Sequence, residues 1–199
     1  MSESAAPPVV AEVLHPIRLV VTDDLQRSRL TVFFRFLLLI PHLIWLAVWS
    51  ISVFLLAIVA WVICLVTGWL PGGVHSFFTV YLRYVTHVNA YWWLLADPFP
   101  KFLGDTGYAV DLEVDGPEQQ GRLGVLFRLI LAIPALLVVE VLQSVAWILA
   151  LIAWFYALAT GRASAGIRDL GAYCLRFQQQ TFGYLLLLTS RYPSFTWES

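Results

Sequence analysis

Two long apolar runs dominate the chain, and a shorter, more polar stretch follows each of them. The first run, Leu30–Val66, has 37 residues and a single charge, Arg35. As a straight helix it would be about 55 Å long, whereas the hydrocarbon core of a bilayer is about 30 Å thick. Pro41 is the natural position for a break. The pattern therefore predicts an interfacial helix over Arg29–Ile40 and a membrane-spanning helix over His42–Val66.

The stretch that follows the first run is ambiguous. Val74–Ala96 is long enough to cross a membrane and ends in an apolar, aromatic segment, but it carries Arg83 and His87 near its centre. Either it crosses with these polar groups turned toward a protein interior, or it lies in the interface. We favour crossing, because Tyr91–Ala96 is continuously apolar, and we expect the same of Ile167–Thr189.

The whole pattern occurs twice in the sequence, with a separation of 93 residues. Arg122–Phe195 aligns with Arg29–Phe102 without a gap, and 25 of the 74 aligned positions are identical. Apolar composition alone cannot explain the matches of Arg35 with Arg128, of Pro41 with Pro134, or of Trp61 with Trp154. The chain therefore contains an internal duplication.

Each copy is preceded by a short segment with strand-like alternation, His15–Thr22 in the first and Tyr108–Asp115 in the second. The two strands could pair into a small ribbon. The repeats then cover 14–106 and 107–199, after a disordered tail at 1–13. A unit with two spans returns the chain to its starting side, so the repeats should be parallel. We predict an all-α membrane protein with two parallel helical hairpins, about four transmembrane helices, two interfacial helices and a short strand before each repeat.

Composition and charge support a membrane location. Apolar residues make up 60% of the chain and charged residues 13%, against about 25% charged in soluble domains. A net charge of -1 argues against nucleic acid as a partner. Eight of ten counted basic residues fall on the side of the predicted termini, which predicts cytoplasmic termini. The expected location is the bacterial cytoplasmic membrane, as a multi-pass protein.

Paired arginines are the main candidate ligands. Arg83 and Arg176 occupy the same repeat position inside predicted spans, where they could form an anion or lipid-headgroup site near the pseudo-twofold axis. The plainer alternative is snorkelling, or hydrogen bonds to carbonyls of a neighbouring helix. A duplicated basic collar could bind acidic lipid or simply anchor the chain, and consists of Arg29, Arg35, Arg122 and Arg128.

Other polar residues within the predicted spans give weaker signals. Glu140 has Gln143 and Ser144 on its helical face, and could be a neutral carboxyl or pair with Arg83 or Arg176. His87 has no second histidine at a ligand spacing, so we expect no metal and no cofactor. The sequence holds none of the common nucleophile, phosphate-loop or zinc motifs. We therefore expect no enzyme.

Three segments resemble a known family: RFLLLIPHLIWL, VTGWLP and YWWLLADPFPKF, which begin at Arg35, Val66 and Tyr91. The family is a bacterial, often actinobacterial, group of integral membrane proteins that is catalogued as a domain of unknown function and often occurs in tandem copies. The resemblance covers both repeats, the first more plainly. It implies the fold and the location, and brings no catalytic residues with it.

The function predicted from these observations is non-catalytic. We expect a membrane scaffold or accessory subunit that packs against another integral membrane protein or against itself. The alternative is a lipid-binding or transport protein that holds an anionic headgroup between the repeats with Arg83 and Arg176. In either case membrane lipids are expected partners.

Overall fold

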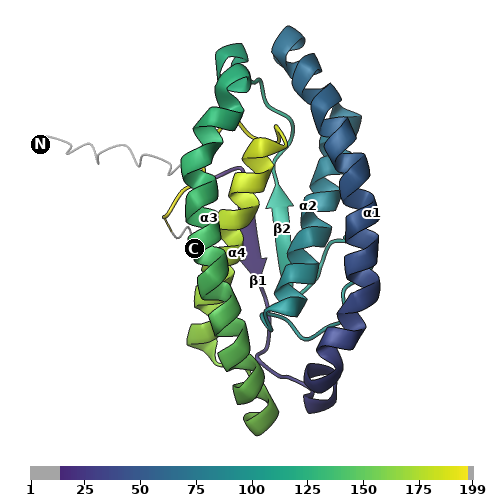
Figure 1. Ribbon diagram of the computed structural model, residues 1–199, viewed down its shortest axis with the longest axis vertical. Helices are drawn as coiled ribbons and strands as arrows, with labels where there is room; N and C mark the ends of the chain where they lie inside the picture. The colour runs from purple at the N-terminus through teal and green to yellow at the C-terminus, as the bar shows by residue number, and fades with distance from the viewer. Residues whose placement is uncertain (1–13, 197–199) are drawn as a thin grey trace, which may run out of the picture.

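The computed structural model describes residues 14–196 and contains four helices and one two-stranded ribbon (Figure 1). The predicted tail at 1–13 lies outside the described residues. The elements in chain order are β1 (Ile17–Val21), α1 (Arg29–Thr67), α2 (Gly72–Trp92), β2 (Val110–Val114), α3 (Arg122–Thr160) and α4 (Ala165–Leu185).

Helices α1 and α3 are each 39 residues long and continue through their prolines. The predicted break at Pro41, with a separate interfacial helix over Arg29–Ile40, is therefore wrong. Pro41 lies on the exposed side of α1, whereas Leu39 and His42 on either side of it are buried against the rest of the fold. Packing on both sides of the proline keeps the helix continuous although one backbone hydrogen bond is lost.

A narrow stripe of each long helix is buried, and its members lie three, four, seven or eleven residues apart, as expected of helices that pack side by side. The two stripes match across the duplication. In α1 the buried residues are Val32, Arg35, Leu39, His42, Val53, Ala60 and Cys64, and in α3 their counterparts Val125, Arg128, Ala132, Ala135, Ala146, Ala153 and Ala157 are buried too. Glycine ends both helices in the left-handed conformation, with φ of 78° at Gly68 and 72° at Gly161.

The two long helices run antiparallel, so the predicted parallel arrangement of the repeats is wrong. At one end the Arg27 amide donates to the Gly161 carbonyl at 3.0 Å, and at the other the Gln120 amide donates to the Gly68 carbonyl at 2.8 Å. The reason lies in the connection. After α1 and α2, the segment with β2 runs along the molecule a third time, so α3 starts at the opposite end (Figure 1).

The ribbon is the part of the fold that the sequence predicted best. β1 and β2 pair antiparallel, with Ile17 opposite Val114 and Val21 opposite Val110. Ile17 and Leu112 on its inner side belong to the core. β1 packs on α4 and β2 on α2, while α2 and α4 in turn pack on α1 and α3. The molecule therefore has three layers: α1 with α3, then α2 with α4, then the ribbon.

Helices α1 and α3 are long and apolar enough to cross a membrane, a test of length and composition alone. Helices α2 and α4, which the sequence predicted as spans, do not meet that test among the described residues. Their polar side chains face protein. Arg83 and His87 of α2 contact Asp111 in β2, and Gln180 of α4 donates to the Ile17 carbonyl at 3.1 Å. These helices form the middle layer of the molecule.

Candidate functional site

Exposed apolar side chains are concentrated on one layer of the molecule. The described residues include 41 exposed large apolar side chains, of which 17 belong to α1 and 15 to α3. Helix α2 contributes none and α4 only Leu170. Apart from their first residues, Arg29 and Arg122, the two helices expose a single charged side chain, that of Glu140. We call the outer surfaces of α1 and α3 the apolar face.

Arg35 lies beneath this face with only 2% of its surface exposed. Its Nη1 donates to the carbonyls of Tyr91 and Ala96, and its Nη2 lies 2.8 Å from a carboxylate oxygen of Asp97. The guanidinium carbon is 4.1 Å from the centre of the Tyr91 ring. Arg35 therefore caps the carbonyl end of α2 and fixes that end to α1.

Arg128 repeats this arrangement in the second copy. Its Nη1 donates to the carbonyls of Tyr184 at 2.5 Å and Thr189 at 3.1 Å. Where Arg35 has a carboxylate, Arg128 has the amide oxygen of Gln120 at 2.5 Å. Both members of the inner pair of the predicted basic collar are thus held by contacts within the protein. Their predicted binding of acidic lipid headgroups remains a prediction.

The turn that follows α2 and α4 also repeats, and sequence reasoning missed it. Leu94 and Leu187 adopt the left-handed conformation, with φ of 58° and 63°, although both carry side chains. Arg27 donates to the Leu94 and Leu95 carbonyls, and Gln120 to the Leu187 carbonyl at 3.2 Å. Buried side chains therefore hold this turn in place in both copies.

The outer pair of the collar, Arg29 and Arg122, is exposed at the beginnings of α1 and α3. Arg29 donates to the Ala159 carbonyl at 3.0 Å. Glu140 is exposed on α3, and Gln143 is half-buried one turn further along. The predicted pairing of Glu140 with Arg83 or Arg176 does not occur among the described contacts, because both arginines have partners elsewhere.

The structure does not give Arg83 and Arg176 a common set of partners. Arg83 donates from Nε to the Leu112 carbonyl at 3.1 Å and lies 3.4 Å from Asp111 in β2. Arg176 donates to the carbonyls of Ser194 and Thr196 near the C-terminus. Their use as a shared headgroup site thus remains a prediction, and the alternative of hydrogen bonds to carbonyls describes the observed contacts.

His87 of α2 and Asp111 of β2 form a titratable pair between the middle layer and the ribbon. His87 is 1% exposed, and its Nε2 donates to an Asp111 oxygen at 2.9 Å. Burial holds the pKa of His87 below its ordinary value despite the nearby carboxylate. For Asp111, burial opposes ionisation, but hydrogen bonds from His87 and from the Gly107 and Leu112 amides outweigh it and hold its pKa below the ordinary value.

Acidification should therefore destabilise the fold. Both groups have a lower pKa folded than unfolded, so the unfolded chain binds more protons and stability falls as pH falls. The His87 contribution is complete above pH about 6.5 and is lost below it, and that of Asp111 is lost only below about 3.8. Between pH 7.5 and 5.5 we therefore expect the melting temperature in mild detergent to fall, and His87 should account for part of that fall. His87→Gln should make the melting temperature depend less on pH in this range. An unchanged pH dependence in this variant would contradict the role given to His87.

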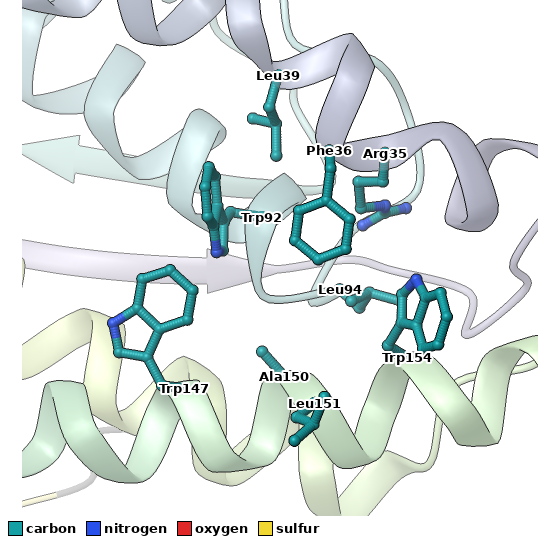
Figure 2. Close-up of a pocket in the computed structure, with 9 residues that line it drawn as sticks. All are labelled: Arg35, Phe36, Leu39, Trp92, Leu94, Trp147, Ala150, Leu151 and Trp154. Atoms are coloured by element: carbon teal, nitrogen blue, oxygen red, sulfur yellow. The ribbon is translucent and has the colours of Figure 1, made fainter.

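Two cavities lie in the seam between α1 and α3, and the duplication relates them. The first has a volume of about 340 Å³ and is shown in Figure 2. The second has a volume of about 520 Å³. Six lining residues of the first match six of the second across the 93-residue shift: Phe36 with Leu129, Trp92 with Leu185, Trp147 with Phe54, Ala150 with Ala57, Leu151 with Ile58, and Trp154 with Trp61.

Matched tryptophans join the two long helices at these cavities. The Trp154 indole donates to the Val32 carbonyl at 3.1 Å, and the Trp61 indole donates to the Val125 carbonyl at 2.9 Å. Each bond links one long helix to the early part of the other. No group of three or more His, Cys, Asp or Glu that could hold a metal ion occurs in the described part of the chain.

Comparison with known families bears on this duplicated arrangement. A family model described as Domain of unknown function (DUF4389) matches residues 29–104 and again 122–196. The chain belongs to the DUF4389 family. The predicted resemblance to a family of unknown function, present here in two copies, is confirmed. No curated protein and no solved structure matches this DUF4389 chain.

Proposed function

We propose that this DUF4389 protein lies in one leaflet of the bacterial cytoplasmic membrane and acts there as a non-catalytic scaffold or accessory subunit. The apolar face of α1 and α3 would rest among lipid chains, and the ribbon would face the cytoplasm. The observation that carries the proposal is the concentration of 32 of the 41 exposed large apolar side chains on these two helices. Such a surface is far too apolar for water.

The length of the apolar face favours helices that lie along the membrane over helices that cross it. Each long helix has 39 residues, or about 58 Å. Exposed apolar side chains reach from Leu30 to Val66 in α1 and from Leu123 to Tyr156 in α3. A bilayer core of about 30 Å would leave much of this surface in water if the helices stood upright.

The ribbon gives a second reason for this orientation. It lies near the middle of the long axis (Figure 1). Its outer side carries Arg18 in ion pairs with Glu113 and Asp115, at 3.6 and 2.8 Å. Upright helices would put these charged side chains at mid-membrane, where the insertion free energy of each is unfavourable by about 2.5–3.5 kcal/mol. They would also expose the unpaired backbone groups at the edges of the two strands to lipid. Lying flat, the molecule keeps the ribbon on the side away from the lipid.

A flat orientation suits a scaffold, because two different surfaces become available to partners. The flanks of α1 and α3 could pack against another membrane protein or a second copy within the leaflet. The charged ribbon could contact a partner in the cytoplasm. Lipid binding is the second candidate function, and the two cavities in the seam favour it.

Single cysteines at the two ends of the molecule test the orientation. Ser28 precedes α1 and Gly72 begins α2, so they mark opposite ends of the long axis, and both are exposed. The native Cys64 and Cys174 are buried. In a flat molecule, a membrane-impermeant maleimide should label Ser28→Cys and Gly72→Cys from the same side, in inverted vesicles but not in spheroplasts.

Val20→Cys on the ribbon is the matched control for this experiment. Val20 is 36% exposed on β1. It should label from the same side as the two end positions. Labelling of the two ends from opposite sides, with Val20→Cys protected, would show upright helices and would refute the proposed orientation.

A further inference from the structure

We infer that the first cavity binds a phospholipid of the surrounding bilayer. One acyl chain of the lipid would lie in the cavity, and its ester carbonyl would accept a hydrogen bond from Nε of Arg35. This inference rests on the proposed function, because the cavity opens within the surface assigned to lipid. It adds a specific ligand class and a specific contact to that function.

The lining of the cavity changes from apolar and exposed to buried along its depth. Phe36, Trp147 and Leu151 are 60%, 47% and 60% exposed, so they form a rim that is continuous with the apolar face. Leu39 and Leu94 are 1% and 4% exposed and form the floor. Figure 2 shows the aromatic side chains from α1, α2 and α3 around this space. A lipid chain could enter from the bilayer without crossing water.

Arg35 supplies a polar anchor within this apolar lining. Its Nη1 and Nη2 are used by two carbonyls and by Asp97, but its Nε is buried and has no partner among the described residues. An unsatisfied buried donor is costly, so an acceptor that enters the cavity is favoured. Because Asp97 already balances the charge of Arg35, a neutral acceptor such as an ester carbonyl suits the site better than a second carboxylate.

The second cavity lacks this anchor and therefore serves as a control within the same molecule. It has matching walls, but Arg128 does not line it. Its polar lining groups already have partners: the Ser50 and Tyr81 hydroxyls lie 2.8 Å apart, and Ser50 donates to the Leu46 carbonyl at 2.6 Å. A lipid chain should thus prefer the smaller first cavity.

Photolabelling of the floor residues tests the inference. The full chain is reconstituted in phosphatidylglycerol and phosphatidylethanolamine vesicles with a trace of phosphatidylglycerol whose acyl chain carries a diazirine near the ester. Cross-links are mapped by mass spectrometry. Labelling at Leu39 and Leu94 should exceed labelling at Val53 and Leu82, the floor of the second cavity, by about tenfold, as expected for a hydrogen bond from a charged donor.

Four variants test the contribution of the cavity volume separately from that of the Arg35 Nε donor. Ala150→Phe fills the first cavity and should remove floor labelling, whereas Ala57→Phe fills the second and should leave it unchanged. Arg35→Lys keeps the charge near Asp97 but lacks Nε, so it should lower floor labelling about tenfold. Arg128→Lys makes the same exchange outside the cavity lining and should have no effect on labelling at Leu39 and Leu94.

The outcomes separate this inference from the proposed function. Strong labelling of rim residues without floor labelling would overturn the lipid site and leave the membrane orientation intact. Equal labelling of the two floors, or floor labelling that Arg35→Lys does not change, would overturn the role of Nε. Absence of labelling from the whole apolar face would overturn the proposed function itself.

Discussion

Arg35→Met is expected to lower the melting temperature in mild detergent by roughly 10 °C, corresponding to about 3 kcal/mol. Methionine is of similar length, so the main loss is electrostatic. The substitution leaves Asp97 without its ion pair and the Tyr91 and Ala96 carbonyls without their donor. Removing one member of a desolvated ion pair costs more than the pair itself contributes, and Asp97, whose side chain is only 24% exposed, would keep part of that cost.

The duplication provides the control for this experiment. Arg128→Met removes the same contacts to carbonyls, but the partner of Arg128 is the neutral Gln120 and no carboxylate is left behind. Arg128→Met should therefore lower the melting temperature less than Arg35→Met does. In the Arg35→Met background, Asp97→Asn should recover part of the loss, since it removes the unpaired charge. An Arg128→Met variant that is as unstable as Arg35→Met would show that the carbonyl contacts, and not the charge, dominate.

Features encoded by short stretches of sequence could be predicted. Alternation over His15–Thr22 and Tyr108–Asp115 was enough to predict the two strands, because alternate side chains face the core, with Ile17 buried in β1 and Val110 and Leu112 buried in β2. The predicted span over His42–Val66 ends one residue before the observed end of α1 at Thr67. The gapless alignment of the two copies was enough to show the internal duplication.

Features that depend on the path of the whole chain could not be predicted. The antiparallel repeats follow from the segment between α2 and α3, whose course along the molecule no local pattern shows. The continuity of α1 through Pro41 depends on packing against other elements. The polar residues of α2, Arg83 and His87, were interpreted as features of a span, whereas Asp111 in the ribbon is their partner.

The candidate site could have been found in part. Arg35 has the same helical phase as Val32, Leu39 and His42, so the seam spacing already places its side chain inside. The position of Arg35 near the start of the helix led instead to its prediction as part of the basic collar. The cavities could not be predicted, because their walls come from segments about a hundred residues apart, such as Phe36 and Trp147.

The loop between α2 and β2 holds α2 against α1, and Gly104 is the residue that makes this possible. Gly104 has φ of 63°, and a Cβ placed on it would lie 2.7 Å from the Val80 carbonyl oxygen and 3.0 Å from the Tyr84 nitrogen. Both neighbours are backbone atoms within α2, which cannot move aside. Just before Gly104, Phe102 stacks on His42 of α1 at 4.4 Å and its carbonyl accepts from Trp45 at 3.1 Å.

Gly104→Ala should therefore destabilise the protein strongly, by about 3 kcal/mol or roughly 10 °C in melting temperature. The left-handed backbone accounts for about 1 kcal/mol, and the forced retreat of the loop from α2 accounts for the rest. Gly107→Ala isolates the first contribution, because Gly107 also has positive φ, 88°, but its added Cβ meets nothing within 4 Å. It should cost only about 3 °C. Equal losses in the two variants would mean that the approach of the loop to α2 contributes little, and that the Phe102 contacts with His42 and Trp45 survive without it.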